Sequence, residues 1–396
     1  MNPAGIGAAT VRGDLGEHEE RQLAWAYLSR VVLGPCPALT ALIDSVGVCE
    51  AARAVRERAL PPVLRTVTER RRELDTAARD LETIRTRGGR LVTPDDAEWP
   101  AWRMLGLAQL TPGRDPDGAL PLVFWVRGHR NLSELTEHAL AVVGARCSTG
   151  YGDRVAGEIT GELAARGWTI VSGAAFGIDG TAHRAALTVG GATIAVMACG
   201  ADRAYPTQHE RLIARIAETG LVISEYPPGT FARKHHFLAR NRLIAALADG
   251  VLVVEAGMRS GARNTVKWAR RIGRPALAVP GSVESAASAG CHRMIRDGEA
   301  VLVTGTAEVL AETAPSRLPL STGSKSSEVD RPGGPEARIL AALPATGGRW
   351  PHDISAMTGL EAAEVRAALV ALDMSGAAAR GEAGWFRLDR AGEGGE

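Results

Sequence analysis

Cysteine is scarce in this sequence, and its few cysteines show no spacing typical of a metal site. The chain has five cysteines in 396 residues, well separated from one another: Cys36, Cys49, Cys147, Cys199 and Cys291. No C-x-x-C pair occurs, and no compact group of Cys and His matches the spacing of a zinc site. The simplest interpretation is reduced thiols in a reducing compartment. We therefore expect neither a metal ion nor another cofactor.

Long apolar runs are missing as well. No stretch approaches the roughly 18 apolar residues of a membrane span, and the N-terminus shows no apolar core of a secretion signal. We therefore expect no membrane span and a cytoplasmic location. The composition, 45% hydrophobic and 23% charged, is typical of a globular protein, and 396 residues allow two or three domains.

The whole chain carries almost no net charge, but one segment of it is strongly basic. The net charge of +1 argues against a histone-like nucleic-acid binder. Between Thr230 and Arg274, however, ten Lys or Arg accompany only two acidic residues. A second basic run, Arg70-Arg71-Arg72, is interpreted as a solvated helix face rather than as a nucleic-acid patch.

The most informative segment is the stretch from Lys234 to Arg242, where basic side chains surround Phe237. Ammonium and guanidinium groups neutralise phosphates, and an exposed phenyl ring offers a face on which an unpaired base can stack. The segment therefore predicts a site for single-stranded nucleic acid. The alternative is a solvated helix face with Phe237 buried. His235 and His236 lack acidic or cysteine companions and are interpreted as surface or lining residues.

The N-terminal part of the chain reads as a tail followed by helices. Residues 1–18 show no periodicity, which predicts a disordered tail. Residues 19–88 carry apolar side chains at three- and four-residue spacing, and the breaker run 34–37 ends the first helix. These features predict a small helical domain, of the SAM or helix-hairpin-helix type.

Residues 89–312 change character, because short runs rich in Val and Ile alternate with helix-length amphipathic segments. The runs are Leu140–Val143, Thr169–Val171, Thr193–Val196, Leu221–Ile223, Val251–Val254, Ala276–Val279 and Val301–Val303. This alternation predicts an α/β fold with a mainly parallel sheet covered on both faces. Ligand sites of such sheets gather at the carboxyl ends of the strands, where Gly-bearing or polar turns follow most of these runs.

The C-terminal part predicts a linker and a second globular unit. Residues 313–335 are rich in Pro, Ser, Thr and Gly, which predicts a flexible linker. Residues 336–390 show three short helices and a terminal strand pattern, the outline of a winged helix, and residues 391–396 form a tail. The third helix carries Arg366 as its one basic residue, with Glu361 and Glu364 at its start. This favours protein contact or a structural role over groove reading.

Two Gly-bearing turns can serve a ligand. The turn at Gly144-Ala145-Arg146 joins a predicted strand to a helix, where backbone amides can bind an anion, although dinucleotide and phosphate-loop spacings are absent. In the segment 172–179, the glycines permit close backbone approach, and Asp179 is interpreted as a helix cap rather than as a catalytic group. His183, on the same predicted helix, fits a polar contact better than a metal ligand.

Together these motifs resemble those of the DNA-processing protein A (DprA, or Smf) family over residues 122–305. The motifs are Gly144-x-Arg146, Tyr151-Gly152, Ser172-Gly173-x-Ala175-x-Gly177-Ile178-Asp179, Gly200, Tyr205-Pro206, Ser224-Glu225-Tyr226-Pro227, Phe237-x-x-Arg240-Asn241-Arg242 and Ala278-Val279-Pro280-Gly281. The chain departs from the family's usual sequence at two places. Residues 261–265 are Gly-Ala-Arg-Asn-Thr, where the family often has Gly-Ser-Leu-x-Thr, and His292 stands where the family often has Asn.

The resemblance implies an extended Rossmann-like core that binds single-stranded DNA. It also implies protection of incoming DNA and loading of the RecA recombinase during natural transformation and homologous recombination, by a homodimer without catalytic residues. By motif, Arg146 corresponds to the DNA-contacting arginine, Lys234 and Phe237 to the lysine and the stacking phenylalanine, and Ser260-Gly261 to a backbone-contacting turn. The predicted DNA-binding residues are Arg146, Ser172, Gly173, Gly177, Lys234, Phe237, Arg240, Asn241, Arg242, Ser260 and Gly261.

Two other classes of function stay open at this point. A nucleotide-processing hydrolase of the lysine-decarboxylase-like group shares a similar sheet and carries Pro-Gly-Gly-x-Gly-Thr-x-x-Glu. The nearest counterpart here, residues 255–261, lacks that signature. A purely structural scaffold would show no salt-dependent affinity for single strands.

Overall fold

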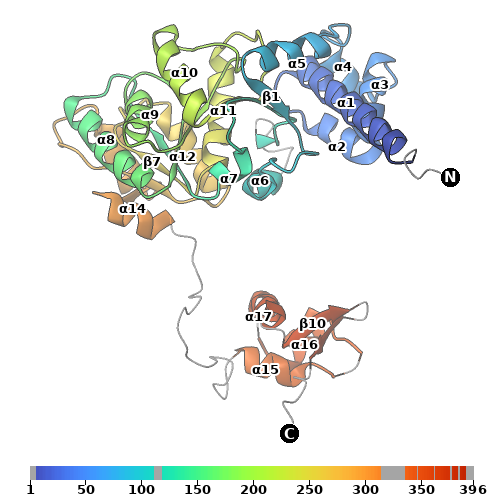
Figure 1. Cartoon of the computed structure of the whole chain (residues 1–396). Coiled ribbons are helices and arrows are strands. Elements are labelled where there is room, and N and C mark those ends of the chain that lie inside the picture. The colour runs from blue at the N-terminus through green and yellow to red at the C-terminus, as the bar shows by residue number, and fades with distance from the viewer. Residues whose placement is uncertain are drawn as a thin grey trace. The chain divides into compact units, whose positions relative to one another are not determined.

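The computed structural model describes residues 6–110, 118–313, 335–345, 347–360, 362–374, 377–381 and 384–388. The chain divides into two compact units, Met1–Ser316 and Arg317–Glu396 (Figure 1). The predicted linker at 313–335 lies outside the described residues except at its ends, and the predicted tail at 391–396 lies wholly outside them.

The larger unit is built on a sheet of nine described strands. They are β1 (Gly89–Val92), β2 (Phe124–Arg127), β3 (Ala139–Val143), β4 (Thr169–Ser172), β5 (Thr193–Val196), β6 (Leu221–Ser224), β7 (Gly250–Val253), β8 (Ala276–Ala278) and β9 (Val301–Leu302). Their order across the sheet is β1-β2-β6-β5-β4-β3-β7-β8-β9. All pairs are parallel except β1 with β2 and β2 with β6.

The α/β fold predicted from the sequence is confirmed, and so is each of the seven predicted strands. Strands β3 to β7 are buried at every position, because helices cover both faces and leave no polar side to alternate with an apolar one. The two antiparallel strands, β1 and β2, were not predicted. They extend the parallel sheet at the side of β6.

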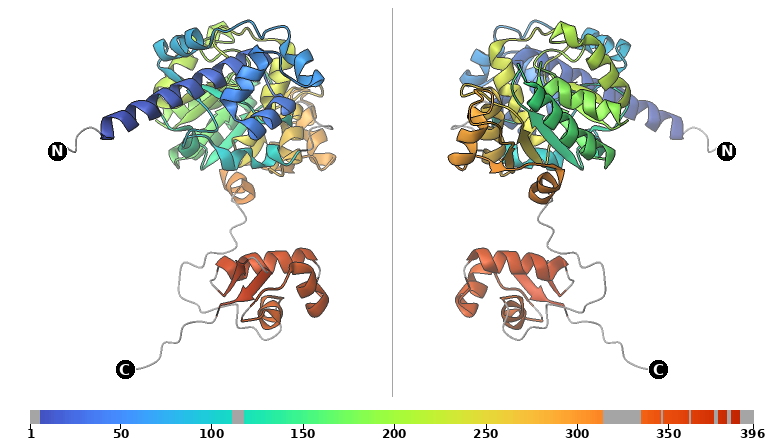
Figure 2. Two further views of the ribbon diagram at one scale, coloured as in Figure 1. Left: turned by 90° about the vertical axis from the view of Figure 1, so that its right-hand side faces the viewer. Right: turned by 90° about the vertical axis from the view of Figure 1, so that its left-hand side faces the viewer.

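Helices lie on both faces of this sheet (Figure 2). One face packs against α6 (Ala101–Ala108), α7 (Leu132–Leu135), α11 (Lys234–Ala246), α12 (Ala262–Arg271) and α13 (Ala289–Arg296). The other packs against α8 (Gly150–Ala165), α9 (Ile178–Thr188), α10 (Glu210–Thr219) and α14 (Thr306–Thr313). Among the described residues, no helix has both the length and the apolar character needed to cross a bilayer.

Five N-terminal helices group at one end of the larger unit (Figure 1). They are α1 (Ile6–Val32), α2 (Pro37–Val46), α3 (Val48–Arg56), α4 (Pro62–Thr68) and α5 (Ala77–Thr86). The disordered tail predicted for residues 1–18 is wrong from Ile6 onward, because α1 already begins there. The first predicted helix does end before the breaker run, at Val32.

These helices do not form a hydrophobic core of their own. Trp25 and Leu28 of α1 belong to the same buried cluster as Trp125 of β2 and Val222 of β6. Hydrogen bonds also join α1 to the segment after β1, because the Asp95 carboxylate accepts from Arg21 and from the Trp25 indole. The helical segment predicted to end at residue 88 therefore continues into the sheet as one compact unit.

The smaller unit contains α15 (Pro335–Ala342), α16 (Pro351–Thr358) and α17 (Ala362–Met374), followed by β10 (Ala378–Gly381) and β11 (Gly384–Arg387). The two strands pair antiparallel, and a bridge from Arg349 to Trp385 adds a third short segment. Apolar side chains from all three helices form one buried cluster with Ala378 of the hairpin. Three helices and a hairpin are the predicted winged-helix outline, which is confirmed.

Candidate nucleic-acid interface

A pocket of about 620 Å³ opens where β3 and β7 lie side by side. The chain leaves β3 toward β4 on one side, whereas β7 continues toward β8 on the other, so the strand order reverses between them. Crevices at the carboxyl ends of such a switch point are the usual ligand sites of open α/β sheets. The pocket is lined by Val143, Gly144, Ala145, Arg146, Cys147, Ala175, Asp179, Phe237, Leu238, Arg240, Asn241, Ile244, Gly257, Arg259, Ser260, Gly261, Ala262 and Thr265.

Two glycines allow the loops around the pocket to approach one another. A Cβ at Gly144 would lie 2.6 Å from the Ile178 side chain and 2.9 Å from the Glu255 carbonyl oxygen. Gly177 has a φ of +72°, and a Cβ there would collide with the Ala145 carbonyl oxygen. Both positions therefore require glycine, since a side chain would force the loops after β3 and β4 apart.

A carboxylate at the end of β7 fixes the loop after β3. Glu255 accepts hydrogen bonds from the Thr149 amide, at 2.9 Å, and from the Thr149 hydroxyl, at 2.6 Å. The same hydroxyl accepts from the Gly152 amide, so Thr149 caps helix α8. The turn that carries Arg146 is thereby held between β7 and the start of α8.

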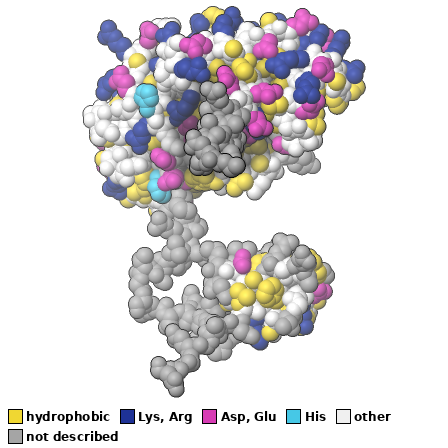
Figure 3. All heavy atoms as spheres, turned by 45° about the vertical axis from the view of Figure 1, so that its right-hand side comes forward, with side chains coloured by type: hydrophobic (Ala, Val, Ile, Leu, Met, Phe, Trp, Pro, Cys, Tyr) yellow, Lys and Arg dark blue, Asp and Glu magenta, His cyan; other side chains and the backbone are white. Residues whose placement is uncertain are grey.

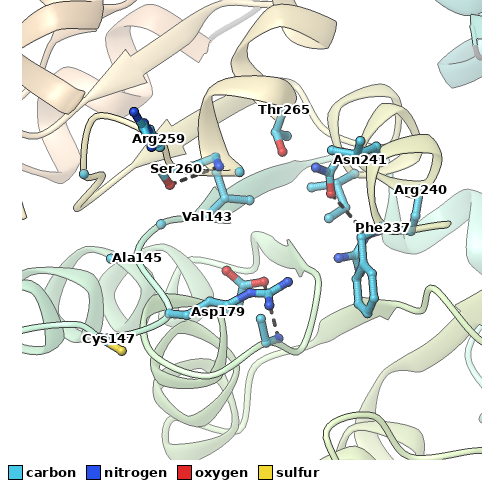
Figure 4. Close-up of a pocket in the computed structure, with 18 residues that line it drawn as sticks. Val143, Ala145, Cys147, Asp179, Phe237, Arg240, Asn241, Arg259, Ser260 and Thr265 are labelled. Carbon is cyan, nitrogen blue, oxygen red and sulfur yellow. Dashed lines mark hydrogen bonds between the residues drawn. The ribbon is translucent and has the colours of Figure 1, made fainter. Parts of the chain in front are cut away.

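Phe237 forms one wall of the pocket. Its ring is half-buried on the first turn of α11, and its centroid lies 5.3 Å from that of Tyr205, which is 44% exposed. The Arg146 guanidinium carbon lies 5.5 Å from the Phe237 centroid. Figure 4 shows Phe237 and Asn241 on one side of the pocket and the turn from Val143 to Cys147 on the other. The alternative of a buried Phe237 is therefore excluded.

Arg240 forms the floor of the pocket and is only 5% exposed. Its guanidinium donates to the carbonyl oxygens of Gly173 and Val196. Any Cβ at Gly173 would meet that guanidinium, at 2.6 Å from Nη2. Burial lowers the pKa of Arg240, and the nearby Asp179 opposes this effect. Arg240 thus places a largely buried positive charge beneath the pocket instead of extending into solvent.

Asp179 does not cap its helix as predicted. The helix begins at Ile178 with Gly177 as its N-cap, and no side chain caps it. The Asp179 carboxylate instead accepts from the amides of Gly173, at 3.1 Å, and Ala175, at 3.4 Å, in the preceding loop. Burial raises the pKa of Asp179, while Arg240 lowers it. Asp179 therefore shapes the loop after β4 beside the pocket.

Arg242 and Ser172 do not reach the pocket, contrary to the expectation from the sequence. Arg242 is fully buried and forms a bidentate ion pair with Glu225, at 2.8 and 2.6 Å. It also donates to the Ala119 carbonyl oxygen, so its charge is held inside the protein. Ser172 is equally buried, and its hydroxyl donates to the Val142 carbonyl oxygen.

Six of the predicted DNA-binding residues line the pocket: Arg146, Phe237, Arg240, Asn241, Ser260 and Gly261. Gly173 and Gly177 lie in the loop behind it, and Lys234 is exposed at the start of α11, just outside the lining. The sequence analysis missed Arg259, an exposed lining residue, and Tyr205. Arg259 is one of the ten basic residues counted between Thr230 and Arg274, whereas nothing in the sequence pairs the Tyr205 ring with that of Phe237.

Three potentially reactive side chains packed against the sheet, those of His183, Cys199 and Cys291, are buried and neutral. His183 places Nδ1 2.7 Å from the Thr193 hydroxyl of β5, and burial lowers its pKa to about 3. Burial raises the pKa of Cys199 to about 11 and that of Cys291 to about 12, so both are thiols at neutral pH. In the described parts of the chain, no group of three or more His, Cys, Asp or Glu side chains could hold a metal ion.

The positive charge at the pocket is local. On the face shown in Figure 3, Lys and Arg side chains are interspersed with Asp and Glu over the larger unit. Several basic residues of the 230–274 segment are also neutralised, as Arg263 is by Glu299 at 2.5 Å. Near the pocket, Arg146, Lys234 and Arg259 are exposed, and none of them has an ion-pair partner within the described parts of the chain.

The model of the family described as DNA recombination-mediator protein A matches residues 90–314, which include the whole pocket. A second model, described as the DprA winged helix domain, matches residues 325–384. The chain belongs to the DprA/Smf family. This membership confirms the family resemblance that was inferred from the sequence motifs. The family also agrees with the parallel sheet and the C-terminal winged helix.

Similar proteins cover most of the chain. The putative DNA processing protein DprA of Mycobacterium tuberculosis (strain H37Rv) is 44% identical over 378 residues, which is 94% of this chain and 95% of that protein. The DprA of Streptococcus pneumoniae (strain R6) is 45% identical over 196 residues, 48% of this chain and 67% of that protein. An X-ray structure of Streptococcus pneumoniae DprA aligns with a TM-score of 0.60 at 31% identity, over 74% of this chain and 97% of that one.

Proposed function

We propose that this family member binds single-stranded DNA in the pocket at the β3–β7 switch point. The observation that carries the proposal is the Phe237 ring, which forms a half-exposed wall of the pocket with the Arg146 guanidinium 5.5 Å from its centroid. An unpaired base stacks on Phe237, and the exposed cations Arg146, Lys234 and Arg259 neutralise the adjoining phosphates. Every base has a stacking face, so binding is independent of sequence.

Features deeper in the pocket favour an anionic strand as well. The buried Arg240 charge lies beneath the pocket, and helix α12 begins directly after Gly261, so the positive end of its dipole lies at the lining. Asn241 is held toward α12 because its amide donates to Asn264 at 3.1 Å. A duplex would present only paired bases, whose faces are closed to Phe237.

The family membership supports a proposal for the biological role. We propose that the protein acts in the cytoplasm, protects incoming single strands and loads RecA on them during natural transformation and recombination. A homodimer would offer two pockets to one strand. The role needs no catalytic residue, since binding and transfer of the strand require no bond to be made or broken. Support comes from the family membership and from the resemblance of Arg146, Lys234 and Phe237 to the family's DNA-contacting positions.

The test compares a labelled oligothymidylate with a duplex of equal length at several salt concentrations, by fluorescence polarisation. We expect single strands to bind more tightly. Phe237→Ala should weaken binding by about 1–3 kcal/mol, the usual value of one stacked base. Lys234→Ala should lower the salt slope by about 0.7. Arg85→Ala, on the exposed face of α5 and paired with Glu82, serves as the charge control.

Two results would contradict the proposal. One is binding by the Phe237 and Lys234 variants that matches the unmodified protein. The other is a strand affinity equal to that of the duplex. The hydrolase alternative is tested on the same samples by incubation with nucleoside monophosphates and triphosphates, where release of base or phosphate would favour an enzyme.

A further inference from the structure

A second, smaller pocket lies where the N-terminal helices meet the core. It has a volume of about 230 Å³ and is lined by Arg30, Leu33, Arg71, Gly229, Thr230, Phe231, Arg233, His235 and His236. Its walls come from the end of α1, the turn after α4, and the segment that enters α11. None of these residues lines the first pocket.

Two of the three arginines in this pocket have no carboxylate partner within the described residues. Arg30 is paired with Asp80 at 2.7 Å and donates to the Pro228 carbonyl oxygen. Arg71 donates to the Val31 carbonyl oxygen at 3.2 Å, and within the described residues neither Arg71 nor Arg233 has a carboxylate partner. Burial lowers the pKa of Arg71, and the charges of Arg70, Arg233 and Arg30 lower it further. A partly buried cation among cations is costly unless an anion joins it.

The nearby carboxylates that the structure describes are already engaged. Asp80 binds Arg30, and Glu225 binds Arg242. Asp202 accepts from the Gly229 amide at 2.9 Å, on the other side of the loop. An anion that pairs with Arg71 and Arg233 would therefore come from outside the described chain.

An exposed aromatic ring adjoins these cations. Phe231 is 67% exposed, more than any other Phe, Tyr or Trp of the described residues. The Arg203 guanidinium carbon lies 3.9 Å from the centre of one face of the ring. At this exposure the ring is accessible to a planar ligand, and an aromatic ring beside cations repeats the combination found at Phe237.

The two pockets share the first turn of α11. Arg233, His235 and His236 line the smaller pocket, whereas Phe237 and Leu238 line the larger one. The His236 ring is stacked on Tyr226, at 4.1 Å between centroids, so this turn is fixed. Lys234 is exposed on the same turn. The two pockets are therefore adjacent along α11, close enough for one strand to occupy both.

We propose that the smaller pocket is a second subsite for the same DNA strand, in which Arg71 and Arg233 each bind a phosphate and Phe231 stacks on a base. The N-terminal helices thereby contribute directly to DNA binding. The inference rests on the proposed function of the first pocket. It also revises the interpretation of Arg70-Arg71-Arg72 as a solvated helix face, because α4 ends at Thr68 and Arg71 lines a pocket.

The test uses oligothymidylates of about 4 and about 16 nucleotides, the limits of usual single-strand site sizes. Phe231→Ala and the double variant Arg71→Gln/Arg233→Gln should bind the short strand like the unmodified protein. Both should bind the long strand about tenfold more weakly, and the double variant should lose about 1.4 from the long-strand salt slope, for two phosphate contacts. Arg85→Ala should change neither.

The outcomes separate this inference from the proposed function. If Phe237→Ala weakens both strands while Phe231→Ala weakens neither, the second subsite is wrong and the first pocket stands. If Phe237→Ala has no effect, the proposed function itself fails. A free phosphate is the other source of the anion: stabilisation by inorganic phosphate that is lost in the double variant, with unchanged long-strand affinity, would overturn the strand path. Thermal melts of each variant without DNA verify that it folds.

Discussion

The Arg242–Glu225 ion pair gives the sharpest test of which basic residues in the 230–274 segment stabilise the fold and which bind DNA. Arg242 stands in the motif that predicted DNA contacts, yet its side chain is 0% exposed and that of Glu225 is 1% exposed. Two hydrogen bonds of 2.8 and 2.6 Å join them. We predict that Arg242→Met lowers stability and leaves the intrinsic DNA affinity of the folded protein unchanged.

The expected loss follows from the burial of both partners. Removing one partner of a buried pair typically costs about 3–5 kcal/mol, because the remaining charge stays buried and uncompensated. Arg242→Met also leaves the carbonyl oxygens of Ala119 and Ala239 without this donor. The double variant Arg242→Met/Glu225→Leu removes both charges, so it should recover much of the loss.

Urea denaturation followed by circular dichroism measures the stability of the unmodified, single and double variants. Fluorescence polarisation with an oligothymidylate, at a temperature where each variant is folded, measures affinity. A single variant of unchanged stability that binds DNA markedly more weakly would refute the reasoning, since it would place the guanidinium on the strand. A double variant as unstable as the single one would contradict the electrostatic cause.

Three further predictions follow from the site. Gly177→Ala should weaken DNA binding and lower the melting temperature, because φ is +72° and a Cβ would meet the Ala145 carbonyl oxygen; an unchanged melt would contradict this. Cys147 is exposed on the pocket lining, so a disulfide reagent should modify it in the native protein, and bound oligothymidylate should slow the reaction; equal rates would exclude DNA from the pocket. His183 has its pKa lowered from 6.5 to about 3, so the unfolded chain takes up a proton that the folded chain excludes. Stability should therefore fall by about 1.4 kcal/mol per pH unit as pH drops below 6.5, and less steeply in His183→Gln; parallel profiles would refute the assignment.

The parallel core could be predicted from the sequence because each strand is a buried run of Val and Ile that ends in a Gly-bearing or polar turn. The antiparallel edge strand β1 gave no such signal, whereas β2 is a buried apolar run followed by Gly128. β1 reads Gly-Arg-Leu-Val and is only half buried, and its pairing with β2 is formed by residues more than thirty positions away. Edge strands of this kind depend on tertiary contacts that no local pattern encodes.

The beginning of α1 was missed for a related reason. Residues 6–18 contain Gly, Ala and charges without an apolar stripe, so periodicity could not identify them as helical. The C-terminal helices were found because apolar residues such as Val365, Leu369 and Leu372 recur at helical spacing and meet in one core. Periodicity detects a helix through the face that it buries, and residues without such a face escape it.

Helix geometry could have separated the basic residues of α11. At about 100° per residue, Arg242 lies about 140° around the helix from Phe237, whereas Asn241 lies within about 40° of it. The structure agrees: Asn241 lines the pocket and Arg242 is buried on Glu225. The burial of Arg240 has no such signal, because it depends on Gly173 leaving room for the guanidinium.

The number of free cations sets the salt dependence of binding. Between Thr230 and Arg274 the sequence counts ten basic residues, but Arg240 and Arg242 are buried and Arg263 is paired with Glu299. Arg146, Lys234 and Arg259 remain at the larger pocket, which predicts a slope of about −2 for a short strand at about 0.7 per contact.

A long strand that also reaches Arg71 and Arg233 should show a slope of about −3.5, from five contacts. The difference between the two slopes, about 1.4, is independent of any contact that both strands share. Measurement of both slopes on the unmodified protein therefore counts the cations of the second subsite before any variant is made. Identical salt slopes for the short and long strands would mean that the N-terminal helices do not contact the DNA.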